Sequence, residues 1–126
     1  MNMVKLLPFM FLMLLLFTTI SYSQEDPYLP FAQVMPQPVG GLEAIYKKID
    51  YPEIARKAGI EGKVYVLVYI NEKGGVDDVK VLKGIGAGCN EAAIDGIKAV
   101  KFSPGKNNGA AVKTKLSLSI NFKLNN

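Results

Sequence analysis

The strictest pattern in this chain is an alternation of apolar and polar residues near its C-terminus. From residue 112 to residue 124, every second residue is Val, Thr, Leu, Ile or Phe, and the residues between them are Lys, Ser or Asn. Side chains of a β-strand point alternately to the two faces of its sheet, so this pattern predicts one long strand with a buried face and a solvated face. The remaining sequence must therefore supply partner strands and a layer that covers the apolar side.

Two more strands are predicted before it. The first begins at Gly62, and its residues 64–70 alternate Val or Ile with Tyr or Leu, so both faces are largely apolar and this strand belongs in the middle of a sheet. Residues 71–75 have the Asn and Gly content of a turn, and residues 76–83 return antiparallel. Val76 is out of phase with Val79, which predicts a β-bulge near the turn.

Three helices are predicted from apolar side chains spaced three or four residues apart. The first covers residues 42–49, and the second covers residues 53–58, which Pro52 opens and Gly59 ends. The main helix begins after Asn90, its N-cap, and ends before Phe102. Its core-facing residues are Ala93, Ile94, Ile97 and Val100.

The topology follows from the handedness of the crossover connection. The second strand, the main helix and the last strand form one crossover unit, and right-handed closure around the first strand gives the order second, first, last. We therefore expect an α+β fold with a three-stranded antiparallel or mixed sheet and helices packed on one face. The last strand then lies on an edge, and because it is longer than its neighbour, part of that edge should be unpaired.

The N-terminal segment is typical of a secretory signal. Lys5 precedes an uncharged run over residues 6–20, and the small residues Ser21 and Ser23 follow it. We expect a signal peptide over residues 1–23, an extended Pro- and Gly-rich lead-in over residues 24–41, and one domain over residues 42–126. An uncleaved membrane anchor is the alternative, because the apolar run could just cross a tilted bilayer.

Residue content argues against catalysis. The chain has no His and one Cys, so it offers no Ser/His/Asp or Cys/His arrangement and no His-based metal site. Cys89 is expected to be a small buried side chain near a helix start, and no internal disulfide can form. A formal net charge of +4 on an exported chain is weak support for nucleic-acid binding. No enzyme activity, cofactor, nucleic acid or small-molecule substrate is therefore expected.

The C-terminal half carries an asymmetric charge. No acidic residue follows Asp95, and six lysines lie beyond it. They are Lys98, Lys101, Lys106, Lys113, Lys115 and Lys123. This distribution favours an acidic partner, although lysines on a solvated face are the commoner explanation. Lys113, Lys115 and Lys123 could equally serve to prevent edge-to-edge pairing.

Several short motifs together resemble the C-terminal domain of TonB proteins. The resemblance runs from about residue 51 to residue 124 and rests on the spacing of the motifs more than on any one of them. The residues that carry it are Tyr51, Pro52, Ala55, Gly59, Glu61, Gly62, Lys63, Val64, Gly75, Val76, Phe102, Ser103, Pro104, Gly105 and Lys106. Among these, Tyr51, Pro52, Gly59, Gly62, Phe102, Pro104 and Gly105 are expected to act structurally.

The resemblance implies a periplasmic protein-binding module of TonB-dependent transmembrane transport. In that family the domain adds a short peptide of an outer-membrane transporter to the edge of its sheet. Carried over by position, the docking edge is Lys113, Thr114, Lys115, Leu116, Ser117, Leu118, Ser119, Ile120, Asn121 and Phe122. Lys47, Lys48 and Asp50 are expected to lie near the partner. An exposed edge supplies main-chain donors and acceptors for such pairing.

Three alternatives stay open. The partner could be another envelope protein instead of a transporter. The domain could be an envelope scaffold that binds peptidoglycan or an acidic protein surface through its Lys-rich half. Two copies could also pair their last strands into a homodimer. If the apolar segment is not cleaved, the domain would be anchored in the inner membrane and face the periplasm.

Overall fold

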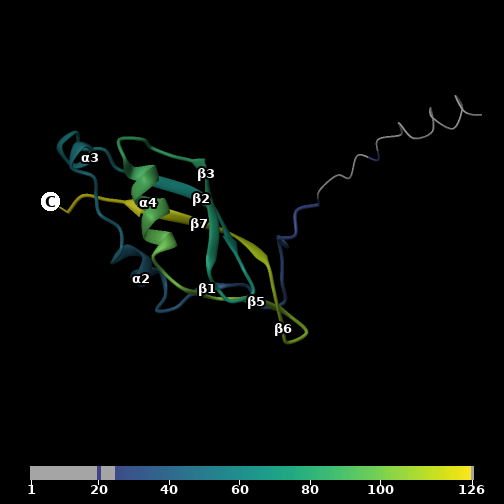
Figure 1. The fold of residues 1–126 in the computed structure, drawn as a ribbon. Coiled ribbons are helices and arrows are strands. Elements are labelled where there is room, and N and C mark those ends of the chain that lie inside the picture. The colour runs from purple at the N-terminus through teal and green to yellow at the C-terminus, as the bar shows by residue number, and fades with distance from the viewer. Residues whose placement is uncertain (1–19, 21–24, 126) are drawn as a thin grey trace, which may run out of the picture.

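The computed structural model describes residue 20 and residues 25–125. The predicted signal peptide, residue 20 aside, lies outside the described residues. The elements follow one another as β1 (Gln37–Pro38), α2 (Leu42–Tyr46), α3 (Glu53–Lys57), β2 (Gly62–Ile70), β3 (Val76–Lys83), α4 (Cys89–Lys98), β4 (Phe102–Ser103), β5 (Gly105–Asn107), β6 (Ala110–Val112) and β7 (Thr114–Phe122). Figure 1 shows α4 lying across the strands β2 and β7. The fold is α+β.

The main sheet has three strands in the order β3-β2-β7, and both pairings are antiparallel. Strand β2 pairs along its whole length with β7, from Gly62 opposite Phe122 to Ile70 opposite Thr114. Strand β7 therefore lies on an edge. The pairing of β2 with β3 shifts register between Tyr69 and Ile70, which confirms the bulge near the turn.

The core lies between the sheet and α4. The residues of β2 that face the helix are Val64, Val66, Val68 and Ile70, and all are fully buried. Ala93 and Ile97 of α4 pack against them, as do Ile45 of α2 and Ala55 of α3. Each large aliphatic side chain buried in this way stabilises the fold by roughly 1.5–3 kcal/mol.

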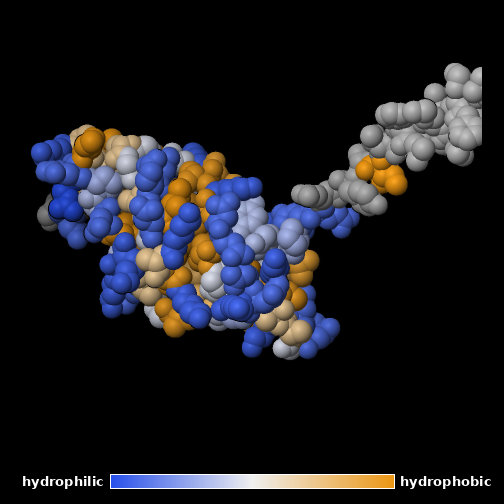
Figure 2. Space-filling model, viewed as in Figure 1, coloured by the Kyte–Doolittle hydropathy of each residue, from blue (hydrophilic) through white to orange (hydrophobic). Residues whose placement is uncertain are grey.

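Cys89 is buried at the start of α4, and burial raises the pKa of its thiol. On the side seen in Figure 2, a strip of apolar surface is visible between α4 and β3.

The helices are shorter than predicted, and the main one begins differently. Helix α2 ends at Tyr46 instead of residue 49, because the next backbone bonds, from Lys48 N–H to Ile45 O and from Ile49 N–H to Tyr46 O, span three residues and tighten the last turn. Helix α4 starts at Cys89 after Gly88, whose backbone is left-handed with φ 86°. The predicted cap, Asn90, lies inside the helix, and its side-chain oxygen accepts hydrogen bonds from the backbone N–H groups of Ile85 and Gly86.

The last strand is also shorter than predicted. The expected strand over residues 112–124 is divided at Lys113, where the chain changes partners: Val112 pairs with Gly105 of β5, and Thr114 pairs with Ile70 of β2. Strand β7 spans 9 residues, as β2 does, so the argument that excess length leaves its edge unpaired was wrong. The edge is open because of its position in the sheet.

The Pro- and Gly-rich lead-in packs along the C-terminal strands. Leu29 forms a parallel bridge with Thr114, and Val34 forms an antiparallel bridge with Lys106. Strand β1 then pairs with β4. The predicted domain boundary after residue 41 stays a prediction. Within residue 20 and residues 25–125, no helix is long and apolar enough to span a membrane.

Candidate functional site

The candidate site is the outer rim of β7, which we define as the backbone N–H and C=O groups of this strand that point away from β2. Two contacts establish which residues contribute to it. The N–H of Lys115 donates to Leu29 O at 2.9 Å, and the N–H of Asn121 donates to the Tyr46 hydroxyl at 3.0 Å. Backbone groups of successive strand residues point to opposite sides, so Ser117 and Ser119 between them also point outward.

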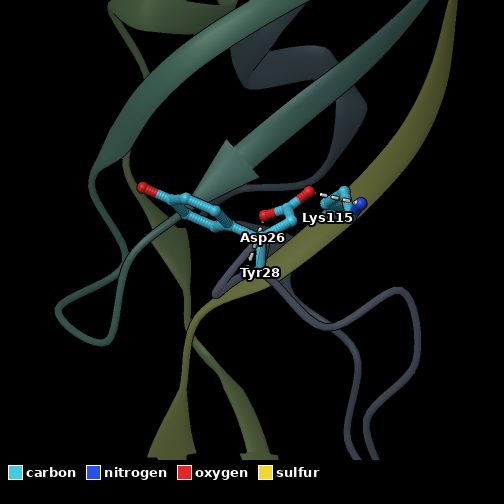
Figure 3. A network of polar contacts seen from close by, with 3 residues as sticks. All are labelled: Asp26, Tyr28 and Lys115. Carbon is cyan, nitrogen blue, oxygen red and sulfur yellow. Dashed lines mark hydrogen bonds and ion pairs between the residues drawn. The ribbon is translucent and has the colours of Figure 1, made fainter. Parts of the chain in front are cut away.

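One end of the outer rim is occupied by the lead-in. The N–H of Leu29 donates to Lys113 O at 2.9 Å, and Leu29 O accepts from Lys115. Figure 3 shows Asp26 between Tyr28 and Lys115, and its carboxylate contacts the Lys115 ammonium at 2.6 Å. This hydrogen bond holds the pKa of Asp26 below its ordinary value and raises the pKa of Lys115. The Tyr28 N–H donates to the same carboxylate.

Tyr28 fastens the lead-in to the sheet. Its ring packs edge-on against Tyr69 with the ring centres 5.0 Å apart, and the Lys113 ammonium lies 5.5 Å from the Tyr28 ring centre. Its hydroxyl donates to the Asp77 carboxylate beside the β2–β3 turn. That hydrogen bond raises the pKa of Tyr28 to about 12 and lowers the pKa of Asp77.

The other end of the outer rim is bounded by α2. Tyr46 reaches Asn121 from the last residue of this helix. The predicted residues Lys47, Lys48 and Asp50 follow it directly and are exposed. They therefore follow the residue that bounds this end of the outer rim. Whether they contact a partner stays a prediction.

The ten residues predicted on the docking edge are not equivalent. Thr114, Ile120 and Phe122 are buried, and Leu116 and Leu118 are half-buried, since this face of β7 meets the helices. Their backbone groups point to β2. The outward-pointing Ser117, Ser119 and Asn121 have exposed side chains. The outer rim between its two occupied ends is thus the accessible part of the predicted edge.

The predicted structural residues stabilise the joints between elements. The Tyr51 hydroxyl donates to Ile60 O, and the Tyr51 ring packs edge-on against Phe122 with centres 5.4 Å apart. Phe102 is 1% exposed. A Cβ on Gly105 would lie 2.1 Å from Thr114 Oγ1, so only glycine fits there. Pro52 directly precedes α3, and Pro104 is half-buried. Gly59 and Gly62 have positive φ angles of 66° and 150°.

An open groove adjoins the accessible part of the outer rim. Its volume is about 470 Å³, and its floor includes Leu67 of β2 with Lys115 and Ser117 of β7. The lead-in residues Pro30, Phe31 and Met35 form its other side. Neither these lead-in residues nor Tyr28 was predicted from the sequence to contribute to the site. The one available signal was the presence of large apolar and aromatic residues between the prolines of an otherwise polar connection.

The arrangement offers main-chain hydrogen bonding and apolar contact. In the part of the chain that the structure describes, His, Cys, Asp and Glu side chains nowhere gather in a group of three that could hold a metal ion. The outward N–H and C=O groups of Ser117 and Ser119 are donors and acceptors in the register of a β-strand. An extended peptide is the chemical entity that matches them.

Comparison with known proteins gives the same family throughout. The family described as Gram-negative bacterial TonB protein C-terminal matches residues 47–124. Protein TonB of Vibrio cholerae is 33% identical over 101 residues, which cover 79% of this chain and 36% of that protein. Protein tonB2 of Pseudomonas aeruginosa is 32% identical over 77 residues, which cover 60% of this chain and 28% of that protein. The chain thus spans about a third of the length of these relatives or less.

Solved structures of TonB C-terminal domains have a similar fold. The solution structure of the Helicobacter pylori TonB C-terminal domain (residues 179–285 of that protein) has a TM-score of 0.53 and 31% identity, covering 68% of this chain and 78% of that one. The Pseudomonas aeruginosa TonB C-terminal domain has a TM-score of 0.51 and 28% identity, covering 62% and 80%. On the match over residues 47–124, this chain belongs to the TonB C-terminal domain family.

Proposed function

We propose that this chain is a periplasmic protein-binding module of TonB-dependent transmembrane transport. It binds segments of outer-membrane transporters, or of related envelope proteins, by β-strand addition at the outer rim of β7, and it catalyses no reaction. The family membership supports a role in transport coupling. Export by the predicted signal peptide, or an inner-membrane anchor in its place, would put the domain in the periplasm.

The observation that carries this proposal is the accessible stretch of outer rim between Leu29 and Tyr46. Among the described residues, none bonds to the outward backbone groups of Ser117 or Ser119. Unpaired strand groups on an edge are ready to pair with another chain. The stretch from Lys115 to Asn121 is about 20 Å long at about 3.3 Å per residue, which suits a short extended peptide.

Two of the six lysines that an ionic scaffold role would use are already engaged within the chain. Of the lysines beyond Asp95, Lys115 is already paired with Asp26 at 2.6 Å, and Lys113 lies over the Tyr28 ring. These charges are less available to peptidoglycan or to an acidic surface. Exposed ionic attraction is strongly screened at about 1 M salt, whereas backbone pairing is not, so binding that persists at high salt supports strand addition.

A proline substitution on the outer rim tests the proposal. Ser119→Pro removes one outward N–H and leaves the β2–β7 hydrogen bonds in place, because proline is tolerated on the solvent side of an edge strand. The probe is a set of fluorescent peptides from the N-terminal segments of outer-membrane transporters of the same organism. We expect Ser119→Pro to weaken binding about tenfold or more, since an unpaired peptide acceptor costs about 1–3 kcal/mol.

Two control variants complete this experiment. Ser119→Ala keeps the backbone N–H and should bind as the wild type does. Leu118→Pro removes an inward N–H and should destabilise the sheet itself. A folded Ser119→Pro protein that binds all peptides with unchanged affinity would refute strand addition at this rim.

Self-association is the competing use of the same surface. If two β7 strands pair, sedimentation velocity will show a dimer of the wild type that Ser119→Pro converts to a monomer. A wild-type monomer at high concentration removes this alternative.

A further inference from the structure

The open groove begins where the lead-in leaves β7. Leu29 pairs with the outer rim through both its N–H and its C=O, and the pairing ends there, since among the described residues no bond from the Phe31 N–H continues it. The chain turns away and returns at Val34, which bonds to Lys106. The loop between these two contacts carries Phe31 beside the accessible outer rim. A strand added at Ser117 would therefore lie between β7 and this loop.

The register of the sheet determines which side chain of an added strand meets the groove. Ser117 is the cross-strand partner of Leu67, and neighbouring side chains across a sheet lie on the same face. Both lie on the face opposite α4. The peptide residue that pairs with Ser117 would project on that face too, into the space lined by Leu67 and Phe31. Its neighbours in the peptide would point to the other face.

The chemistry of the lining favours an apolar side chain. Phe31 is 82% exposed, and Pro30, Met35 and Leu67 add further apolar surface. The one charged group in the lining, Lys115, is neutralised by Asp26. A charged side chain would thus lose hydration here without gaining a partner, whereas a bulky apolar one would be removed from water.

We propose that this groove selects a bulky apolar side chain at the peptide position that pairs with Ser117, and that Phe31 and Leu67 determine this specificity. The inference rests on the proposed function, since the peptide must first pair with the outer rim. The occupant is a short extended peptide with one large aliphatic or aromatic residue at a defined position. Covering a Leu or Phe side chain should favour it over Ala by about tenfold.

The test uses an uncharged host peptide of alternating Val and Thr in which Leu, Phe, Ala or Asp is placed at each position in turn. Affinities for the full mature protein are measured by fluorescence anisotropy. For the wild type we expect one position at which Leu and Phe bind about tenfold tighter than Ala, and Asp binds weakest. Phe31→Ala should reduce this preference to about threefold or less. An NMR contact between the Leu methyl groups and the Phe31 ring should appear at that position alone.

Two variants separate the possible outcomes. Leu82→Ala removes another exposed apolar side chain, 61% exposed and outside the groove lining, and should leave the preference intact. Ser119→Pro should weaken binding of Leu and Ala peptides alike, by about tenfold or more. If Ser119→Pro weakens binding in this way while Phe31→Ala keeps the full preference, the groove inference is overturned and the outer rim stands. If Ser119→Pro binds every peptide normally, or the wild type binds none, strand addition fails and the inference fails with it.

Discussion

Gly105 illustrates how one small residue permits the joint between the lead-in and the C-terminal strands. It lies against Thr114, the residue at which β7 begins, and a Cβ added to it would lie 2.1 Å from Thr114 Oγ1 and 3.4 Å from Pro36 Cδ. Thr114 is fully buried, and its hydroxyl donates to Val112 O. Pro36 is at ordinary contact distance, so the clash is with the buried Thr114 side chain, and it disfavours any side chain at this position.

Gly105→Ala should therefore lower the free energy of unfolding by about 1–3 kcal/mol, the usual cost of overfilling a packed site. Urea denaturation measures it. Combining Gly105→Ala with Thr114→Ala removes the clashing oxygen. The double variant should therefore lose less free energy of unfolding than the two single variants lose in sum. Strict additivity of the two changes would show that the contact does not limit packing.

At the scale of elements, β7 has two sides that should differ in protection. The N–H groups of Leu116, Leu118 and Ile120 point to β2, whereas those of Ser117 and Ser119 point to the outer rim. Amide hydrogen exchange should be slow for the first group and fast for the second, because only the first is paired. NMR-detected exchange at neutral pH reports each residue separately. Equal protection of Ser117 and Leu118 would contradict the assigned register.

Sequence patterns predicted the strands better than their ends. The alternation over β2, β3 and β7 reflects a buried face, so local composition reveals it. The division at Lys113 was not predictable, because Val112 and Thr114 keep the same phase on both sides and only their distant partners differ. The helix start was mistaken for a related reason: Asn90 can cap a helix, but here its side chain closes the loop before the helix, by accepting from Ile85 and Gly86.

The candidate site was predicted in part. Family resemblance indicated residues 113–122, and alternation distinguishes their buried from their exposed side chains. The contribution of the lead-in was missed. Its prolines predict an extended chain, but nothing local indicates that Leu29 pairs with Lys113 and Lys115. Such long-range pairing depends on the whole fold.

For the molecule as a whole, the attachment of the lead-in should depend on acid. The pKa of Asp26 is lowered, chiefly by its hydrogen bond with Lys115, and that of Asp77 is lowered by its hydrogen bond with Tyr28. Because both pKa values are lowered, the two contacts stabilise the attached state to their full extent at any pH above the ordinary value of 3.8. This stabilisation is lost as the pH falls through the lowered pKa values. We expect the attachment of the lead-in to weaken below pH 3.8, so that it is released more often.

The amide of Lys115 reports this release, because detachment exposes it to exchange. Its protection, relative to that of Leu118, should fall with pH. The Asp26→Asn variant lacks the ion pair with Lys115 at every pH. Protection of its Lys115 amide should therefore be lower already at neutral pH and should depend less on pH. Protection of Lys115 that stays constant down to the pH at which the sheet unfolds would contradict the expectation.

The same attachment determines where the molecule yields first under tension. A load applied at Asp26 reaches its ion pair with Lys115 and the two hydrogen bonds of Leu29 before it reaches Val34 or β1. The lead-in would therefore peel away in short steps and lengthen the chain. The nine-residue pairing of β2 with β7 is not among these contacts, so the sheet keeps its strand order while the lead-in lengthens.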